Sequence, residues 1–154
     1  MASTEIRPAR PEDVEPIAAD MREADRREVW ASSLATPRLA LERSLAASAV
    51  AWTGLVDGRP AAMFGAAPLS ELSGRGSAWL LGARALAIIP RDFLLRSKDM
   101  VGLMLERFPV LTNLVDARNA ASLRWLRWLG AQFGPARPYG PLGALFVPFE
   151  LGRR

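Results

Sequence analysis

The sequence contains no cysteine and no histidine, and only one tyrosine, among its 154 residues. Without cysteine the chain has no disulfide, no thiolate metal ligand and no cysteine nucleophile. Without histidine it lacks the side chain that most often serves as a base near neutral pH and as a zinc ligand. We therefore expect no metal site, and either metal-free chemistry or none.

Lysine and long apolar runs are also scarce. Lys98 is the only lysine, so arginines supply nearly all of the positive charge, and the net charge is +4. The arginines are scattered rather than grouped in runs, which argues against a nucleic-acid surface. Arg84 and then residues 90–92 interrupt the longest apolar run before it reaches the roughly 20 residues that cross a bilayer. Residues 1–6 lack the basic start and apolar core of a signal peptide. We expect no specific nucleic-acid partner, no membrane span and synthesis in the cytoplasm.

What is present fits one globular domain over residues 1–154. Half of the residues are hydrophobic and 23% are charged, which is typical of folded proteins. Hydrophobic periodicity and turn residues predict the element order. The predicted elements are a strand at 5–9, a helix from about 11 to 21, helical residues to 48 with a restart at Thr36-Pro37, strands at 50–56 and 60–66 around Asp57-Gly58, a strand at 78–87 with a bulge at Gly82, a helix from 92 to 108, and strands at 110–115 and 145–149 with a helix between them.

The most informative stretch is residues 116–133. Asn119 is a good N-cap, since its side-chain oxygen can accept from free N–H groups of the first turn, and Gly130 suits the position just after a helix. A helix of about three turns is predicted between them. Its inner face is formed by residues three and four apart: Ser122, Trp125, Leu126 and Leu129.

An Asn that opens a helix ending in Leu-Gly resembles the last conserved helix of the GCN5-related N-acetyltransferases, the GNAT superfamily. The start Ile-Arg-Pro-Ala, with Asp13 four residues later, and the order of strands and helices are also similar to that family over nearly the whole chain. The resemblance implies an α+β fold, in which helices flank a mixed, mostly antiparallel central sheet in a single domain.

The same resemblance shows which functional groups are missing. The acid that protonates the leaving thiolate in such enzymes is typically a Tyr seven residues after the Asn, and here that residue is Leu126. These enzymes bind the pyrophosphate of acetyl-CoA on N–H groups of a Gly-rich turn after the fourth strand. The equivalent residues 88–97 contain no glycine, Pro90 lacks an N–H, and Asp92 adds negative charge. We therefore expect no bound cofactor. A vestigial cleft, if one remains, would involve Ala87, Ile89, Arg91 and Asn119.

A general base is equally hard to find. The predicted fourth strand carries no carboxylate, and Asp57, Glu71 and Asp116 lie in or beside turns, where they are expected to serve as turn residues or caps. Tyr139 lies in the Pro- and Gly-rich segment 135–141, a poor place for an acid. We predict no catalytic residue.

More narrowly, the chain resembles the small internal virion proteins of short-tailed phages, which have a reduced acetyltransferase-like fold. The similar features are the Ile-Arg-Pro start, the strand around Trp79 followed by the turn at 90–92, and Arg-Trp-Leu within the helix from Asn119 to Gly130. This resemblance implies a non-catalytic virion protein, made in the host cytoplasm and present in several copies, that contacts other virion proteins such as portal or tail components. Two alternatives are a divergent acetyl-CoA-dependent N-acetyltransferase and a host-directed inhibitory binding protein.

Overall fold

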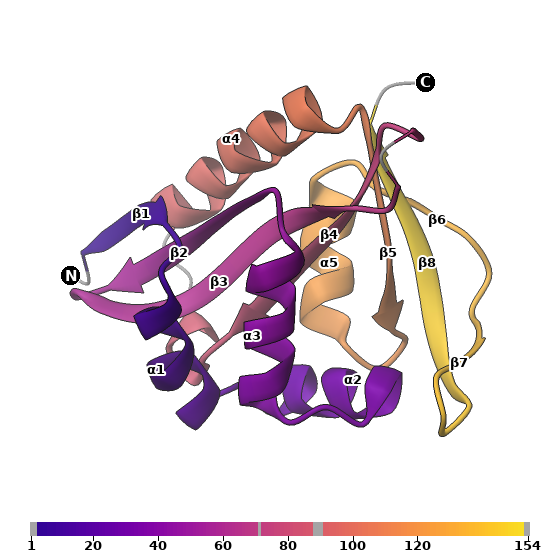
Figure 1. Cartoon of the computed structure of the whole chain (residues 1–154), viewed down its shortest axis with the longest axis horizontal. Coiled ribbons are helices and arrows are strands. Elements are labelled where there is room, and N and C mark those ends of the chain that lie inside the picture. The colour runs from indigo at the N-terminus through magenta and orange to yellow at the C-terminus, as the bar shows by residue number, and fades with distance from the viewer. Residues whose placement is uncertain (1–2, 71, 88–90, 153–154) are drawn as a thin grey trace.

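A computed structural model describes residues 3–70, 72–87 and 91–152, which form one eight-stranded sheet with helices on both faces (Figure 1). In chain order its elements are β1 (Thr4–Pro8), the 3-10 helix η1 (Pro11–Asp13), α1 (Val14–Ala19), α2 (Glu23–Ser33), α3 (Pro37–Ala47), β2 (Val50–Val56), β3 (Arg59–Pro68), β4 (Arg75–Gly82), the 3-10 helix η2 (Arg84–Ala87), α4 (Arg91–Arg107), β5 (Val110–Asp116), α5 (Ala120–Trp128), β6 (Gln132–Phe133), β7 (Arg137–Tyr139) and β8 (Ala144–Gly152). None of the described helices is both long and apolar enough to cross a membrane.

The sheet is mixed and mostly antiparallel, as predicted. Its strand order is β1-β2-β3-β4-β5-β8-β6, with β7 also paired to β8, and only β4 and β5 run parallel. The parallel pairing covers three residue pairs and ends at Ser77 and Thr112. Both strands continue beyond that point, so their carboxyl ends diverge. We call the space between residues 78–82 of β4 and 113–116 of β5 the wedge.

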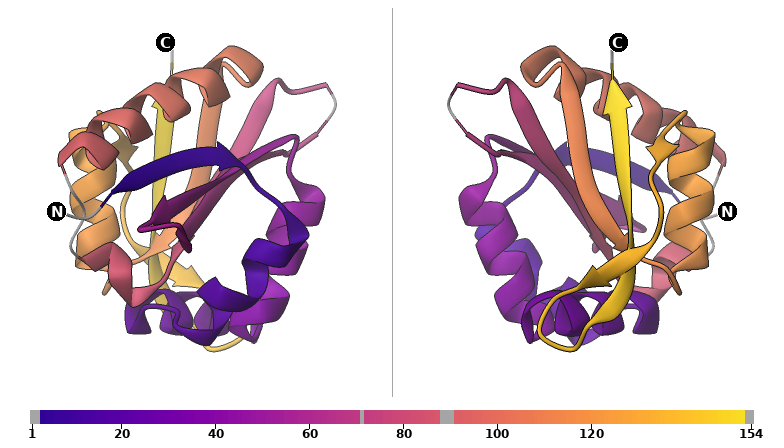
Figure 2. Two further views of the ribbon diagram at one scale, coloured as in Figure 1. Left: turned by 90° about the vertical axis from the view of Figure 1, so that its left-hand side faces the viewer. Right: turned by 90° about the vertical axis from the view of Figure 1, so that its right-hand side faces the viewer.

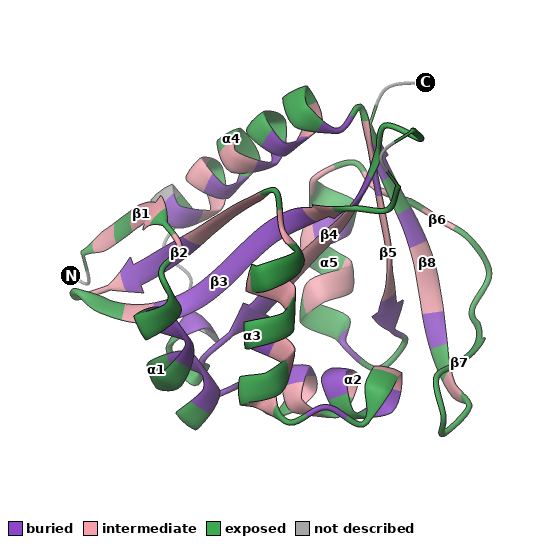
Figure 3. Cartoon of the chain, in the orientation of Figure 1, coloured by how far each residue is buried: buried purple, intermediate pink, exposed green. Residues whose placement is uncertain are grey.

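The two faces of the sheet bury different helices (Figure 2). Because side chains alternate along a strand, Met63 and Leu81 pack with α1 and α3, while Phe64 packs with α4 and α5 on the other side. Figure 3 shows that β3 is buried along most of its length, whereas the outer sides of the helices are exposed. The α2 helix lies at the end of the sheet where the wedge opens (Figure 2).

The local signals near two turns give the predicted structures. Asp57 and Gly58 have φ of 50° and 77°, the left-handed values of a tight two-residue hairpin turn between β2 and β3. Asn119 caps α5, since its side chain accepts from Ser122 N at 3.4 Å, and Gly130 follows the helix with φ of 89°. The predicted hairpin and the predicted helix are both confirmed.

Two sequence predictions are wrong. The strand expected over 78–87 ends at Gly82, and residues 84–87 form η2 instead. The chain leaves the sheet there because Arg22 N donates to the Gly82 carbonyl and Arg84 N donates to the Asp20 carbonyl, each at 2.9 Å. The Pro-rich segment after α5 was expected to be only a connection, yet it contains β7. Pro138 is tolerated in that strand because β7 pairs on one side only, with β8.

Candidate functional site

At the narrow end of the wedge, where β4 and β5 begin to diverge, one side chain replaces the bonds that the two strands no longer make to each other. Asn113 Nδ2 donates to the Ala78 carbonyl oxygen at 2.7 Å, and its Oδ1 accepts from Leu114 N at 2.7 Å. Asn113 therefore holds the two strands together at the point where they begin to diverge. Farther along, the freed backbone groups need other partners, because an unpaired buried N–H is costly.

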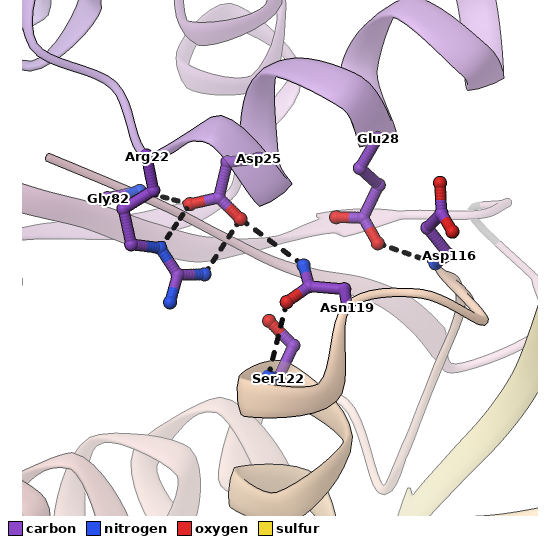
Figure 4. A network of polar contacts seen from close by, with 7 residues as sticks. All are labelled: Arg22, Asp25, Glu28, Gly82, Asp116, Asn119 and Ser122. Atoms are coloured by element: carbon purple, nitrogen blue, oxygen red, sulfur yellow. Dashed lines mark hydrogen bonds and ion pairs between the residues drawn. The ribbon is translucent and has the colours of Figure 1, made fainter. Parts of the chain in front are cut away.

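The α2 helix supplies those partners with two carboxylates (Figure 4). Asp25 Oδ2 accepts from Gly82 N, the last residue of β4, at 2.9 Å, and Glu28 Oε1 accepts from Asp116 N, the last residue of β5, at 2.6 Å. Asp25 and Glu28 are one helical turn apart, so the same face of α2 closes the open end of the wedge.

Asp25 is the centre of a buried network. Its carboxylate, with no exposed surface, accepts two hydrogen bonds from Arg22, at 2.9 and 2.8 Å, and one from Asn119 Nδ2 at 3.3 Å. These bonds join α2, the end of β4 and the cap of α5 (Figure 4). Sequence reasoning missed this network, although acidic residues at 25 and 28 beside the buried Val29 share one helical face.

The backbone of Leu80 remains available inside the wedge. Ala83 N donates to the Ala61 carbonyl at 2.7 Å, so hydrogen-bonded and non-hydrogen-bonded pairs alternate from there along β3 and β4. Leu80 then falls in a non-hydrogen-bonded pair with Phe64. Its N–H and C=O therefore point away from β3 and toward β5. Because β5 has diverged at this point, the two groups take part in neither the β3–β4 nor the β4–β5 hydrogen-bond ladder.

A cavity of about 290 Å³ occupies the wedge. Most of its wall is apolar and comes from both faces of the sheet, because the gap between β4 and β5 connects the side of α2 and α3 with the side of α4 and α5. Tyr139 of β7 lies in this wall, with its ring edge-on to Phe146 at a centroid distance of 5.3 Å. The polar side chains in the wall are Glu28, Ser32, Ser33, Arg43, Ser44, Asn113, Ser122 and Tyr139, together with the indole of Trp79 and Trp125.

Glu28 is the only carboxylate in the cavity wall among the described residues. Burial raises the pKa of Glu28 to about 8, and the nearby charges of Asp25 and Asp116 act in the same direction. The hydrogen bond from Asp116 N and the charge of Arg22 oppose the shift. At pH 7 the Glu28 side chain is therefore mostly neutral, and it ionises near pH 8.

A second, smaller space of about 50 Å³ lies between α4, α5 and β4. Trp125 of α5 lines this space, and its indole N–H donates to Ser97 Oγ of α4 at 3.2 Å. Leu80 and Trp125 line both this space and the wedge cavity. The bond between Trp125 and Ser97 therefore ties α5 to α4 beside the boundary between the two spaces.

The residues predicted for a vestigial cofactor cleft lie as follows. Ala87 ends η2, Ile89 is outside the described residues, and Arg91 is the exposed first residue of α4. Asn119 is buried as the α5 cap. Neither Arg91 nor Asn119 lines either cavity. The membership of such a cleft stays a prediction.

The two described turn carboxylates accept hydrogen bonds from backbone N–H groups. Asp57 Oδ1 accepts from Ser3 N at 2.9 Å, and Asp116 Oδ1 accepts from Arg118 N at 2.9 Å, while Glu71 lies outside the described residues. No group of three or more Asp or Glu side chains among the described residues is placed to hold a metal ion.

Acetyl-CoA, the cofactor of enzymes with this arrangement of elements, does not fit the described residues. Residues 83–101 contain no glycine that could let a diphosphate approach the backbone. Arg96, which could attract a phosphate, donates instead to the Thr4 carbonyl of β1 at 3.2 Å. We therefore derive no chemical step through acetyl-CoA.

Neither a protein-family model nor a curated protein sequence matches the chain. Solved structures do match. An N-acetyltransferase from Staphylococcus aureus Mu50 has a TM-score of 0.71 at 15% identity, covering 97% of this chain and 98% of that one. The ribosomal-protein-S18-alanine N-acetyltransferase from Escherichia coli has 0.67 at 13%, covering 99% and 96%. A Salmonella typhimurium structure described as an acetyltransferase with its cofactor acetyl-CoA has 0.60 at 16%, covering 97% and 93%. The chain has the fold of the GCN5-related N-acetyltransferases.

Proposed function

We propose that this chain is a non-catalytic protein with the acetyltransferase fold, which acts by binding other proteins. The observation that carries the proposal is the absence of glycine from residues 83–101, because a diphosphate then has no close approach to backbone N–H groups at the start of α4. Leu126, at the position of the family's acid, supports it further. That side chain is 4% exposed and packs in the core, so it has no chemical role to play.

The setting we propose is the particle of a short-tailed phage, with portal or tail proteins as partners. This part of the proposal rests on the sequence resemblance to internal virion proteins around Trp79 and the helix after Asn119. Mass spectrometry of purified particles tests it, and we expect several copies per particle. A chain absent from particles would instead favour the host-directed inhibitory binding protein.

The second candidate is a divergent N-acetyltransferase. Two observations favour it: the similar solved structures carry acetyltransferase names, and Glu28 faces the wedge cavity with its pKa raised to about 8. A carboxylate with a pKa near the working pH can accept a proton from an amine, as a general base must. This candidate requires the chain to bind an acyl donor without a glycine turn at the start of α4.

Isothermal titration calorimetry with acetyl-CoA separates the two candidates. For the non-catalytic protein we expect no heat of binding above dilution, since the start of α4 offers no glycine turn. Micromolar affinity would overturn the proposal in favour of the enzyme, and acetylation of an amine probe would then be measured with Glu28→Gln as the variant.

A further inference from the structure

The wall of the wedge cavity is mostly apolar, but it includes an exposed arginine. This is Arg43 of α3, and among the described residues its guanidinium makes no hydrogen bond or ion pair. Arg38, on the same helix, differs because it pairs with Glu42 at 2.8 Å and Glu15 at 3.1 Å. Arg43 is therefore a cation at the cavity mouth whose charge the described structure does not use.

Glu28 presents a second donor. One oxygen accepts from Asp116 N, and the other carries no bond in the network of Figure 4. The charged groups that act on Glu28 are Arg22 and Asp25 from its own segment and Asp116 from β5. Arg43 lines the same cavity. Because Glu28 is neutral below about pH 8, its free oxygen can donate an O–H into the cavity.

The backbone adds a third donor and an acceptor. Leu80 N–H and C=O point into the wedge and belong to neither ladder. An exposed strand edge of this kind pairs with an extended peptide by main-chain hydrogen bonds. A cavity of about 290 Å³ lies at the small end of ligand sites, so it holds one large side chain and a terminal group rather than a long segment.

We propose that the wedge cavity binds the C-terminus of a partner protein, with its last apolar side chain inside and its terminal carboxylate held by Arg43 and Glu28. The carboxylate supplies the negative charge that Arg43 lacks, and it accepts the Glu28 O–H. The preceding peptide unit pairs with Leu80. This inference rests on the proposed function, since it names the partner chemistry of a protein-binding site.

The experiment is fluorescence anisotropy with a labelled peptide, Gly-Ser-Gly-Ser-Gly-Leu, with either a free C-terminal carboxylate or a C-terminal amide. We expect the free acid to bind about tenfold more tightly than the amide at pH 7, as one lost charge-assisted bond implies. Arg43→Gln should remove that preference. Arg59→Gln, at an exposed residue outside the cavity wall, should leave it unchanged.

The pH dependence gives a second, independent readout. Between pH 7 and 9 the affinity of the free acid should fall, because Glu28 ionises and then repels the carboxylate. Glu28→Gln keeps the acceptor for Asp116 N and stays neutral, so its affinity should be the same at both pH values. Thermal unfolding monitored by circular dichroism shows that each variant is folded.

Equal affinity for acid and amide, or an unchanged preference in Arg43→Gln, would overturn the inference. If 4-methylpentanoic acid competes as strongly as the peptide, the ligand is a free acid and the peptide assignment fails. The acetyl-CoA titration separates failure of the proposed function from failure of the peptide inference. If the chain binds acetyl-CoA and not the peptide, the proposed function is wrong. If it binds neither, only the peptide inference is wrong.

Discussion

The side-chain amide of Asn119 donates to the buried carboxylate of Asp25 at 3.3 Å, although the two residues are 94 positions apart. The amide oxygen of Asn119 accepts from Ser122 N at the same time, so a helix cap and a distant acid are held by one side chain. The cap of α5 and the position of α2 are therefore coupled (Figure 4).

Asp25→Asn should strongly destabilise the fold. The substitution keeps the size of the side chain but leaves Arg22 without its charge partner, and Gly82 N with a weaker acceptor. Loss of one member of a buried ion pair costs about 3 kcal/mol. We expect the free energy of unfolding, measured by urea denaturation, to fall by about that amount.

Glu42→Gln is the matched control. Glu42 forms an ion pair with Arg38 at the same distance of 2.8 Å, but both side chains are about half-exposed or more. Solvent and side-chain entropy cancel most of such a pair. We expect no measurable change in the free energy of unfolding for Glu42→Gln. Equal losses in the two variants would contradict the conclusion that the buried hydrogen bonds of Asp25 stabilise the fold.

Two glycines with nearly the same φ should tolerate alanine differently. Gly58 and Gly140 have φ of 77° and 78°, so alanine is strained at both positions. A Cβ at Gly58 meets nothing within 4 Å, whereas one at Gly140 collides with the Ala31 carbonyl oxygen of α2. Gly58→Ala should cost about 1 kcal/mol.

Gly140→Ala should cost clearly more, because the turn between β7 and β8 must move away from α2. The difference in midpoint between the two thermal unfolding curves measures this extra cost. Similar midpoints would show that the turn does not pack against α2, and with it the position of Tyr139 in the cavity wall would be wrong.

Local signals were sufficient to predict much of the fold. Asp57-Gly58 and the pair of Asn119 and Gly130 specify a turn and a helix through backbone conformations that few other residues adopt. The apolar spacing around Leu126 predicts its buried face, and the resemblance supplied the sheet. Trp128, which the spacing places off that inner face, is 45% exposed.

The site was much less predictable, because it depends on where two strands part. Nothing local to Asp25 or Glu28 shows that they bond the ends of β4 and β5, since those strands lie more than fifty residues away in sequence. The end of β4 at Gly82 is likewise decided by Arg22 and Asp20, through contacts that form only in the folded chain. Carboxylates in strands and turns therefore gave no indication of a site on α2.

Acid should destabilise the protein through Asp13. Burial raises the pKa of Asp13, but hydrogen bonds from Arg7 at 2.8 Å, Thr53 at 2.7 Å and Arg10 N at 2.9 Å outweigh it and hold the pKa below its usual value. Because the folded pKa is the lower one, this contribution is complete above the unfolded pKa of about 4 and is lost as pH falls through the folded value.

Asp13→Asn should thus be less stable than the wild type at pH 7, with a shallower loss of stability between pH 5 and pH 2. Urea unfolding at pH 7, 4 and 3 measures both. The variant keeps part of the pH dependence through Asp116. Burial raises the pKa of Asp116, but its hydrogen bonds with Arg118 outweigh that effect and lower the pKa. A slope identical to that of the wild type would mean that Asp13 is not ionised in the folded protein.

Trp125→Ala tests whether the indole of Trp125 affects acetyl-CoA binding. Removing the indole deletes the bond to Ser97 and should lower the free energy of unfolding by about 2 kcal/mol, because Trp125 is partly buried. Trp128→Ala is the control, since Trp128 is about half-exposed. Its ring makes a cation–π contact with Lys98, whose Nζ lies 5.5 Å from the ring centroid. It should change stability by less than about 1 kcal/mol.

In calorimetry we expect no acetyl-CoA binding to Trp125→Ala, although the space between α4 and α5 is then open. The start of α4 still has no glycine turn, and Arg96 still bonds to β1. Binding to this variant but not to the wild type would show that Trp125 alone blocks an otherwise working cofactor site. The diphosphate site would then be present after all, and the lack of cofactor binding in the wild type would depend on one side chain.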